Sequence, residues 1–241
     1  MKRAKVDIYI SFFCYSSNGG YSAILPEIAF WWAKTFYAMR QDDRIGRVGY
    51  GKFADTPIDM MRNRAIKVAQ EQGFDMILMI DSDNEPDGYL GVDPAAKPYW
   101  EVAFPLAYDR LMVGKPTVGA APYCGPPPSP TNHADEGEVP YLFQWLNSAT
   151  DDVEPRMKLH RLNRNEAAIM TGVHRMAAVP TGVCLFTLNA FEGLAKPYVH
   201  YEMASDGTEK MSTEDVVVTR NISLLWQEKI GENVVFATCD S

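Results

Sequence analysis

The sequence predicts a single α/β domain with a mostly parallel central sheet flanked by helices. Apolar segments of strand length alternate with amphipathic segments of helical length along the 241 residues. Residues 76–80 are apolar without polar alternation, which is typical of a strand buried on both faces. A hydrophobic content of 46% supports one sizeable core, and neither a linker nor an internal repeat divides the chain.

Composition narrows the class of protein. The net charge of −8 argues against general electrostatic binding to a nucleic-acid backbone, although a local basic groove is compatible with it. The four cysteines form no CxxC pair, which favours a reduced cytoplasmic protein over a zinc site or a disulfide scaffold. No apolar run reaches membrane-spanning length. The start resembles a signal peptide superficially, but Asp7 interrupts its apolar part and no small-residue cleavage site follows.

The first part of the chain predicts a strand, a helix and a second strand. Residues 6–13 form an apolar segment of strand length, and a polar, glycine-rich turn follows at residues 15–21. Pro26 suits the first turn of a helix, and apolar residues recur behind it at helical spacing. We expect a short strand near Val48.

The helix that precedes residues 76–80 has recognisable ends. Asp55 or Thr56 can cap it, Pro57 suits its first turn, and Gly73 can end it. Its apolar positions share one face, which we expect to pack on the sheet: Ile58, Met61, Ala65, Val68 and Ala69. Because this helix leads directly into an apolar strand, the order is that of a β–α–β unit.

A long proline-rich loop is expected in the middle of the chain. Residues 122–140 contain three successive prolines, which remove backbone donors and exclude a helix or a central strand. Long loops of this kind often carry function. Residues 141–179 contain only weak strand signals. The other elements expected are an irregular insertion at 87–98, a helix at 99–113, strands at 117–121, 183–188 and 234–237, a short helix at 189–194, and a long helix at 213–230 closed by Gly231.

Two carboxylates, Asp81 and Asp83, stand directly behind the apolar strand. The carboxyl ends of parallel strands are where α/β sheets place their ligands. Unpaired carboxylates there would repel each other, and a hard divalent cation would relieve the repulsion. Oxygen ligands with no His or Cys nearby favour Mg²⁺ or Mn²⁺ over zinc. The motif therefore predicts a metal site beside a phosphate-bearing ligand, with a solvated turn as the alternative.

Four further polar side chains are candidates for contacts with a nucleotide. Arg62 and Asn63 lie early in the helix before the acidic motif, and the planar fork of Arg62 matches phosphate oxygens. The alternative is a solvent-facing arginine with a hydrogen-bonding neighbour. Tyr15 and Asn18 follow the first strand and are expected to border the same crevice.

A second acidic motif, Glu214-Asp215, opens the long helix. Ser212 as the N-cap with Asp215 three residues later approximates a capping box, which is a purely structural explanation. Acids in the first turn also suit the helix dipole. A carboxylate at a helix N-terminus can in addition act as a general base, so both interpretations can hold together.

In this order, the elements resemble the nucleotide-diphospho-sugar transferase fold of GT-A type, and in particular inverting glycosyltransferases of family 2 as found in bacteriophage and bacterial genomes. The resemblance covers most of the chain and rests on the first strand, Arg62-Asn63, Asp81-Ser82-Asp83, residues 182–191 and Glu214-Asp215. It implies one Rossmann-like domain over residues 1–241 that moves a sugar from a nucleotide-diphosphate donor, with a UDP-sugar favoured, to an acceptor hydroxyl. The acceptor would be a glycan, a protein or a hydroxylated DNA base.

The resemblance also implies roles for individual residues. Asp83 would coordinate Mn²⁺ or Mg²⁺, and Asp81 would contact the ribose or the water shell of the metal. Asp215, positioned by Glu214, would take the proton of the acceptor hydroxyl. Such enzymes often add a metal-binding histidine beyond the last strand, whereas His200 and the other histidines lie upstream, with His200 expected on a strand. Either the metal uses fewer protein ligands or the chain is shortened.

Two alternatives use the same residues differently. A metal-dependent nucleotidyltransferase or phosphohydrolase would use the same carboxylates and would release diphosphate or phosphate rather than a nucleoside diphosphate. A non-catalytic protein of the nucleotide-sugar fold would bind a carbohydrate or a partner and would not need Asp215.

Overall fold

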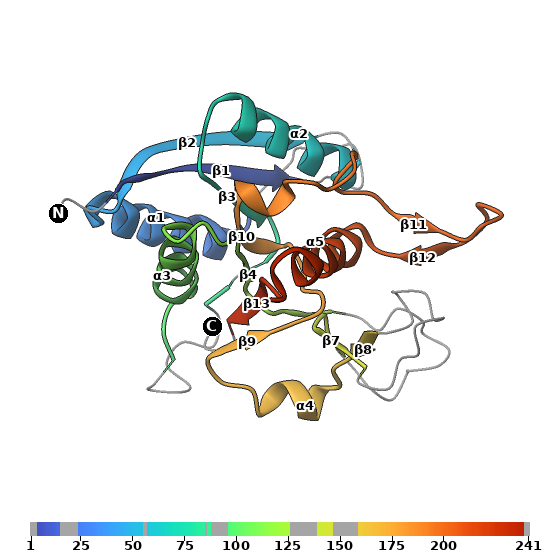
Figure 1. Cartoon of the computed structure of the whole chain (residues 1–241). Helices are drawn as coiled ribbons and strands as arrows, with labels where there is room; N and C mark the ends of the chain where they lie inside the picture. The colour runs from blue at the N-terminus through green and yellow to red at the C-terminus, as the bar shows by residue number, and fades with distance from the viewer. Residues whose placement is uncertain are drawn as a thin grey trace.

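The computed structural model describes residues 4–14, 24–54, 57–84, 86–87, 96–125, 139–146 and 159–238. A central sheet of seven strands organises this part of the chain, in the order β2-β1-β3-β10-β4-β13-β9 (Figure 1). Its strands are β1 Val6–Cys14, β2 Ile45–Ala54, β3 Met76–Asp81, β4 Val118–Ala120, β9 Val173–Arg175, β10 Val183–Thr187 and β13 Val235–Thr238.

Most strands of this sheet run in one direction. Strand β1 is parallel to β2 and β3, and β13 is parallel to β4. Strand β10 is antiparallel to both β3 and β4, so β4 shares the direction of β3, and β9 is antiparallel to β13. The mostly parallel α/β fold is therefore confirmed, with two reversed strands.

Two layers of helices cover the sheet (Figure 1). On one face, α1 Pro26–Gln41 and α3 Tyr99–Leu111 enclose a core that contains the side chains of Ile8, Ile10 and Leu78. On the other face, α2 Ile58–Glu71 and α5 Glu214–Ile230 pack over Tyr9, Ile77 and Met79. The alternation of β1 and β3 residues between these two cores is the period-two pattern of strands that are buried on both sides.

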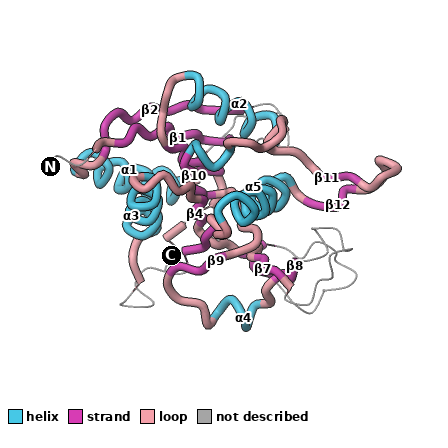
Figure 2. The backbone as a smooth tube through the Cα atoms, viewed as in Figure 1, coloured by secondary structure: helices cyan, strands magenta, loops and turns pink. Residues whose placement is uncertain are grey.

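Smaller elements lie beyond the sheet, and Figure 2 shows the described loops and turns in pink. Strands β5 Cys124–Gly125 and β6 Val139–Pro140 pair, as do β7 Phe143–Trp145 and β8 Leu159–Arg161. Strands β11 Glu202–Met203 and β12 Lys210–Ser212 form a hairpin that projects from the start of α5. The remaining elements are α4 Arg164–Ala168 and the 3-10 helix Leu188–Phe191. Within the described residues, no helix has the length and apolar character needed to cross a membrane.

Several predicted boundaries are wrong. Strand β2 is ten residues long rather than short, because its glycines and charged residues hide the strand signal. Helix α2 has Pro57 at its N-cap rather than in its first turn, and the expected caps Asp55 and Thr56 lie outside the described residues. The helix expected at 189–194 is the 3-10 turn Leu188–Phe191, and His200 lies in a loop before β11 rather than on a strand. Most of the insertion at 87–98 and of the loop at 122–140 lies outside the described residues.

The carboxyl edge of the sheet gathers segments from the whole chain. The Ser82 N–H donates to the Phe13 carbonyl, which joins the ends of β3 and β1. The Asp81 N–H donates to the Gly182 carbonyl over 2.6 Å, which places the start of the reversed strand β10 at the same edge. Helix α5 also begins there. Polar side chains at these ends therefore converge, as expected for a ligand site in an α/β sheet.

Candidate functional site at the carboxyl edge of the sheet

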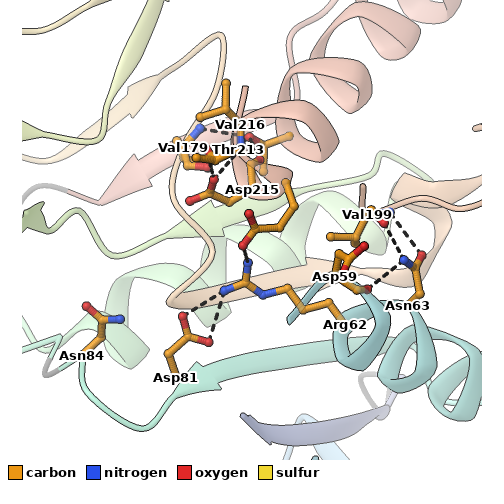
Figure 3. A network of polar contacts seen from close by, with 12 residues as sticks. Asp59, Arg62, Asn63, Asp81, Asn84, Val179, Val199, Thr213, Asp215 and Val216 are labelled. Atoms are coloured by element: carbon orange, nitrogen blue, oxygen red, sulfur yellow. Dashed lines mark hydrogen bonds and ion pairs between the residues drawn. The ribbon is translucent and has the colours of Figure 1, made fainter. Parts of the chain in front are cut away.

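A buried arginine joins the two acidic motifs (Figure 3). The Arg62 guanidinium donates to Asp81 over 2.9 and 3.2 Å through Nη2, and to Glu214 Oε1 over 2.8 Å through Nη1. The Arg62 side chain is only 3% exposed. The solvent-facing alternative for Arg62 is therefore wrong. Residues that are 152 positions apart in the sequence meet in one ion-pair network.

The position of Arg62 on α2 explains its burial, and the neighbouring carboxylates explain why it stays charged. It lies beside the apolar stripe that packs on the sheet, so its side chain has no path to solvent. Burial alone would lower the pKa of Arg62, but the carboxylates of Asp81 and Glu214 outweigh burial and hold the pKa above its ordinary value. A buried charge is tolerated when opposite charges and hydrogen bonds satisfy it. Arg62 thus relieves part of the carboxylate repulsion that the sequence assigned to a metal alone.

The network nevertheless has more acids than cations. Four carboxylates gather around Arg62, which contacts two of them, so the cluster has an excess of three negative charges at full ionisation: Asp81, Asp83, Glu214 and Asp215. Burial raises the pKa of Asp81 to about 6; Arg62 opposes this rise, and the charges of Asp83 and Asp215 add to it. Burial also raises the pKa of Glu214, with Arg62 opposing. The site is therefore electrostatically suited to a further cation.

The two acids at the start of α5 lie in different environments. Glu214 is buried against Arg62, whereas Asp215 is only half-buried. Thr213, not Ser212, is the N-cap residue, and its side chain accepts no capping hydrogen bond from the helix backbone. The predicted capping box with Ser212 is therefore wrong. Instead, the Thr213 hydroxyl donates to Asp215 Oδ1, which also accepts from the Val216 N–H over 2.9 Å. These contacts fix the Asp215 carboxylate at the helix start, as Figure 3 shows.

Two tyrosines that the sequence did not single out border the network. Burial, together with the charges of Asp215 and Asp81, holds the pKa of Tyr123 well above its usual range. Burial and the charge of Glu214 raise the pKa of Tyr201 to about 12, and the Tyr201 hydroxyl is hydrogen-bonded to Glu214. Tyr123 follows strand β4, so its place behind a strand end was a usable signal. Tyr201 lies in a loop, and no sequence signal marked it.

A glycine makes room beside Tyr123. A Cβ atom at Gly182 would lie 2.9 Å from Cε1 of Tyr123 and within contact distance of the Asn84 amide. Any larger residue would force these side chains apart, because such distances are not found for real Cβ atoms. Gly182 therefore allows Asn84 and Tyr123 to meet at the edge of the acidic site. Asn84 donates to Asp83 Oδ1 over 3.2 Å.

The other predicted site residues have different placements. Asn63 lies away from the acids: its amide donates to the Val199 carbonyl over 2.6 Å and to the Asp59 carbonyl, and it accepts from the Val199 N–H. It thus attaches the loop before the β11–β12 hairpin to α2. Asp83 is exposed and has no cationic partner among the described residues. Tyr15 and Asn18 lie outside the described residues.

The protein groups alone do not make a closed metal centre. Within the described ranges, no group of three or more His, Cys, Asp or Glu side chains is arranged to hold a metal ion. The exposed Asp83 and the half-buried Asp215 are the members of the acidic cluster that the Arg62 guanidinium does not contact. This arrangement is compatible with Mg²⁺ or Mn²⁺, which commonly use one or two carboxylates together with phosphate oxygens and water.

Comparison with known proteins gave no family. No protein-family model matches the chain. No curated protein matches it either. One solved structure, described as the crystal structure of A197 from STIV, is similar over 95% of this chain and 81% of its own, with 13% sequence identity and a TM-score of 0.42. A similarity at this level gives no information about function.

Proposed function

We propose that the protein is a metal-dependent glycosyltransferase that moves a sugar from a nucleotide-diphosphate donor, with a UDP-sugar favoured, to an acceptor hydroxyl. One observation carries the proposal. The Asp81–Asp83 motif and the Glu214–Asp215 motif, far apart in the sequence, meet at the carboxyl edge of the sheet through Arg62. Ligands of open α/β sheets bind at this edge.

The two acids of α5 suit different tasks. Glu214 is committed to Arg62 and Tyr201, so it is suited to position its neighbours. Asp215 is half-buried and has no cationic partner among the described residues, so it is suited to accept a proton. In the proposed reaction, Asp215 takes the proton of the acceptor hydroxyl while the acceptor oxygen forms a bond to the anomeric carbon. The bond from that carbon to the diphosphate breaks, and direct displacement inverts the anomeric centre.

The donor set fits a hard divalent cation. Asp83 would hold Mn²⁺ or Mg²⁺, and Asp81, already paired with Arg62, would contribute through the ribose or a metal-bound water. The excess negative charge of the site would favour the cation. When bound, the ion would stabilise the charge of the departing diphosphate as a Lewis acid.

A thermal-shift screen tests the donor site. UDP-, GDP-, CDP-, ADP- and dTDP-sugars are added with and without Mn²⁺ to the native protein and to Asp83→Ala. Because a ligand that binds only the folded state raises the melting temperature, we expect a Mn²⁺-dependent shift for one nucleotide that the variant loses. Thr208→Ala, on the distant hairpin turn, is the matched control and should keep the shift.

Product analysis separates this proposal from the alternatives. A glycosyltransferase releases a nucleoside diphosphate and retains the sugar on the acceptor, whereas a nucleotidyltransferase releases diphosphate. Diphosphate as the product would replace the proposed reaction with nucleotidyl transfer. The absence of a shift for every donor would favour a phosphohydrolase or a non-catalytic protein.

A further inference from the structure

Within the described part of the chain, strand β2 pairs on one side only. It is the terminal strand of the seven-stranded sheet and pairs only with β1 among the described residues. Its ten residues make it a long edge, and Tyr50 on it is 74% exposed. Unpaired strand edges are templates for another strand, and proteins usually cover or shorten them. The β2 edge is therefore a candidate interaction surface.

A cavity of about 330 Å³ opens along this edge, between β2 and α2. Four consecutive residues of the edge strand line it, from Gly51 to Ala54, together with Tyr9 on β1 and Arg64 and Val68 on α2. The cavity is thus continuous with the unpaired backbone. A volume of this size accommodates one side chain or a small molecule.

Tyr9 lines this cavity, and its hydroxyl has no hydrogen-bond partner among the described residues. Tyr9 is only 5% exposed, and its hydroxyl forms no hydrogen bond within the described part of the chain. A Cβ at position 51 would overlap the Tyr9 oxygen, so Gly51 is what allows the hydroxyl to lie against the edge strand. Burial raises the pKa of Tyr9, so the group is a hydrogen-bond donor at neutral pH. The hydroxyl is therefore available to donate to an acceptor that enters the cavity.

Two unpaired cations flank the same edge on opposite faces of the sheet. Arg64 lines the cavity on the α2 face and is exposed. Lys52 pairs in register with Phe12, whose ring packs on Trp32 of α1, so the Lys52 side chain lies on the other face. Neither cation forms an ion pair with another described residue. In a chain of net charge −8, this local positive charge is complementary to an acidic ligand.

We propose that the β2 edge binds an extended acidic peptide as an added strand. Side chains of a strand alternate between faces, so two consecutive acids of the peptide would meet Arg64 and Lys52 respectively. The acid on the α2 face enters the cavity and accepts from the Tyr9 hydroxyl. Backbone hydrogen bonds to β2 supply affinity, and the two cations select acidic side chains, which is how strand addition generally combines affinity with specificity. This binding is independent of sugar transfer.

Fluorescence anisotropy with a labelled Thr-Val-Glu-Glu-Val-Thr peptide tests the proposal. The Gln-Gln version of the peptide should bind roughly tenfold or more weakly, as expected for the loss of hydrogen bonds between charged groups. Arg64→Glu should weaken binding of the acidic peptide by a similar factor. Lys67→Glu makes the same charge change on the same exposed helix face, but Lys67 pairs with Glu71 and does not line the cavity, so affinity should change by less than about twofold. Tyr9→Phe, which removes only the hydroxyl, should weaken binding several-fold.

Three kinds of outcome would overturn the proposal. The first is equal binding of the Glu-Glu and Gln-Gln peptides, or absence of binding by a native protein with normal circular dichroism. The second is competition by free N-acetylglutamate at the same concentration as the peptide, which would assign the cavity to a small anion. The third is a dimer in sedimentation that Arg64→Glu dissociates, which would assign the edge to a second copy of the chain.

Discussion

Two ion clusters of opposite composition lie in the described part of the chain, and they differ in the environment of their central group. At the carboxyl edge of the sheet, one cation, Arg62, is surrounded by carboxylates and is 3% exposed. In the second cluster, between the end of α5 and β13, one acid, Glu232, accepts from three cations: Arg110 over 2.6 Å, Lys115 over 2.7 Å and Arg175 over 3.0 Å.

The two clusters place their central group in different environments. Hydrogen bonds from Lys115 and Arg110 lower the pKa of Glu232 to about 2, so this acid is held in its charged form. Burial raises the pKa of Asp81 to about 6 even though Arg62 contacts it. The solvated cluster stabilises the charged form of Glu232. In the buried cluster, burial disfavours the charged forms of Asp81 and Glu214. The pKa values of Asp81 and Glu232 are both perturbed, but only that of Asp81 is perturbed by burial beside a specific charge partner, which is the combination typical of functional sites and favours the Arg62 cluster as the site of the proposed function.

Removal of the central cation should have the largest effect on stability. Arg62→Met would leave Asp81 and Glu214 buried without their cationic partner, and we expect a loss of about 3–5 kcal/mol in the free energy of unfolding. Arg175→Met is the matched control, because Arg175 is 59% exposed and shares Glu232 with two other cations, so its loss should stay below about 1 kcal/mol. Urea denaturation measures both. Equal losses would show that burial does not distinguish the clusters.

Asp215→Asn should have the largest effect on catalysis with little effect on the fold. The amide oxygen can still accept from the Val216 N–H, so the start of α5 is preserved, but an amide cannot take a proton. We expect turnover to fall about 100- to 10,000-fold with donor binding retained, measured by nucleoside diphosphate release and by thermal shift. Asp206→Asn on the hairpin turn is the control and should keep full turnover. Unchanged turnover in Asp215→Asn would remove the general base from the proposal.

The pH dependence of stability should have opposite signs in the two clusters. The pKa of Asp81 is higher in the folded than in the unfolded state, so the folded state binds the extra proton and stability falls as pH rises from about 4 to about 6. The pKa of Glu232 is lower in the folded state, so stability is present above its ordinary value of 4.5 and is lost as pH falls toward 2.

Melting temperatures of the metal-free protein between pH 2 and pH 7 check both signs. Asp81→Asn should flatten the profile between pH 4 and 6, and Glu232→Gln should flatten it between pH 2 and 4.5. If Asp81→Asn leaves the profile unchanged between pH 4 and 6, and Glu232→Gln leaves it unchanged between pH 2 and 4.5, the pKa shifts given to these two acids are wrong.

The sequence predicted the parts of the fold that depend on local patterns. Met76 to Ile80 are all buried in β3, as their continuous apolar character indicated, and Gly231 closes α5 with a positive φ of 66°. Strand direction was not predictable for β10, because a strand buried on both faces has the same composition whichever way it runs. The length of β2 was underestimated, because edge strands carry glycine and charge in place of apolar residues.

The site was predictable in its acids but not in its connections. Asp81 and Glu214 were singled out from the ends of their elements, and these ends meet at one edge of the sheet. The contact between Arg62 and Glu214 depends on tertiary packing over 152 residues, for which a single sequence has no local signal. Tyr201 escaped notice for the same reason, because its role follows from a hydrogen bond to Glu214 and not from any motif.

The smallest expected effect concerns the solvated cluster and completes the comparison. Lys115→Ala removes a side chain that is 47% exposed, and Glu232 keeps its contacts to Arg110 and Arg175. Exposed ion pairs contribute little, because water and salt screen them and the long side chain loses freedom on pairing, so we expect a change below about 1 kcal/mol. The effect should shrink further in 1 M salt, where screening is strong, whereas the cost of Arg62→Met should persist because buried charges are screened far less. A loss above about 2 kcal/mol for Lys115→Ala that salt does not reduce would show that the Glu232 cluster behaves energetically like the buried Arg62 cluster and would remove the distinction between the two.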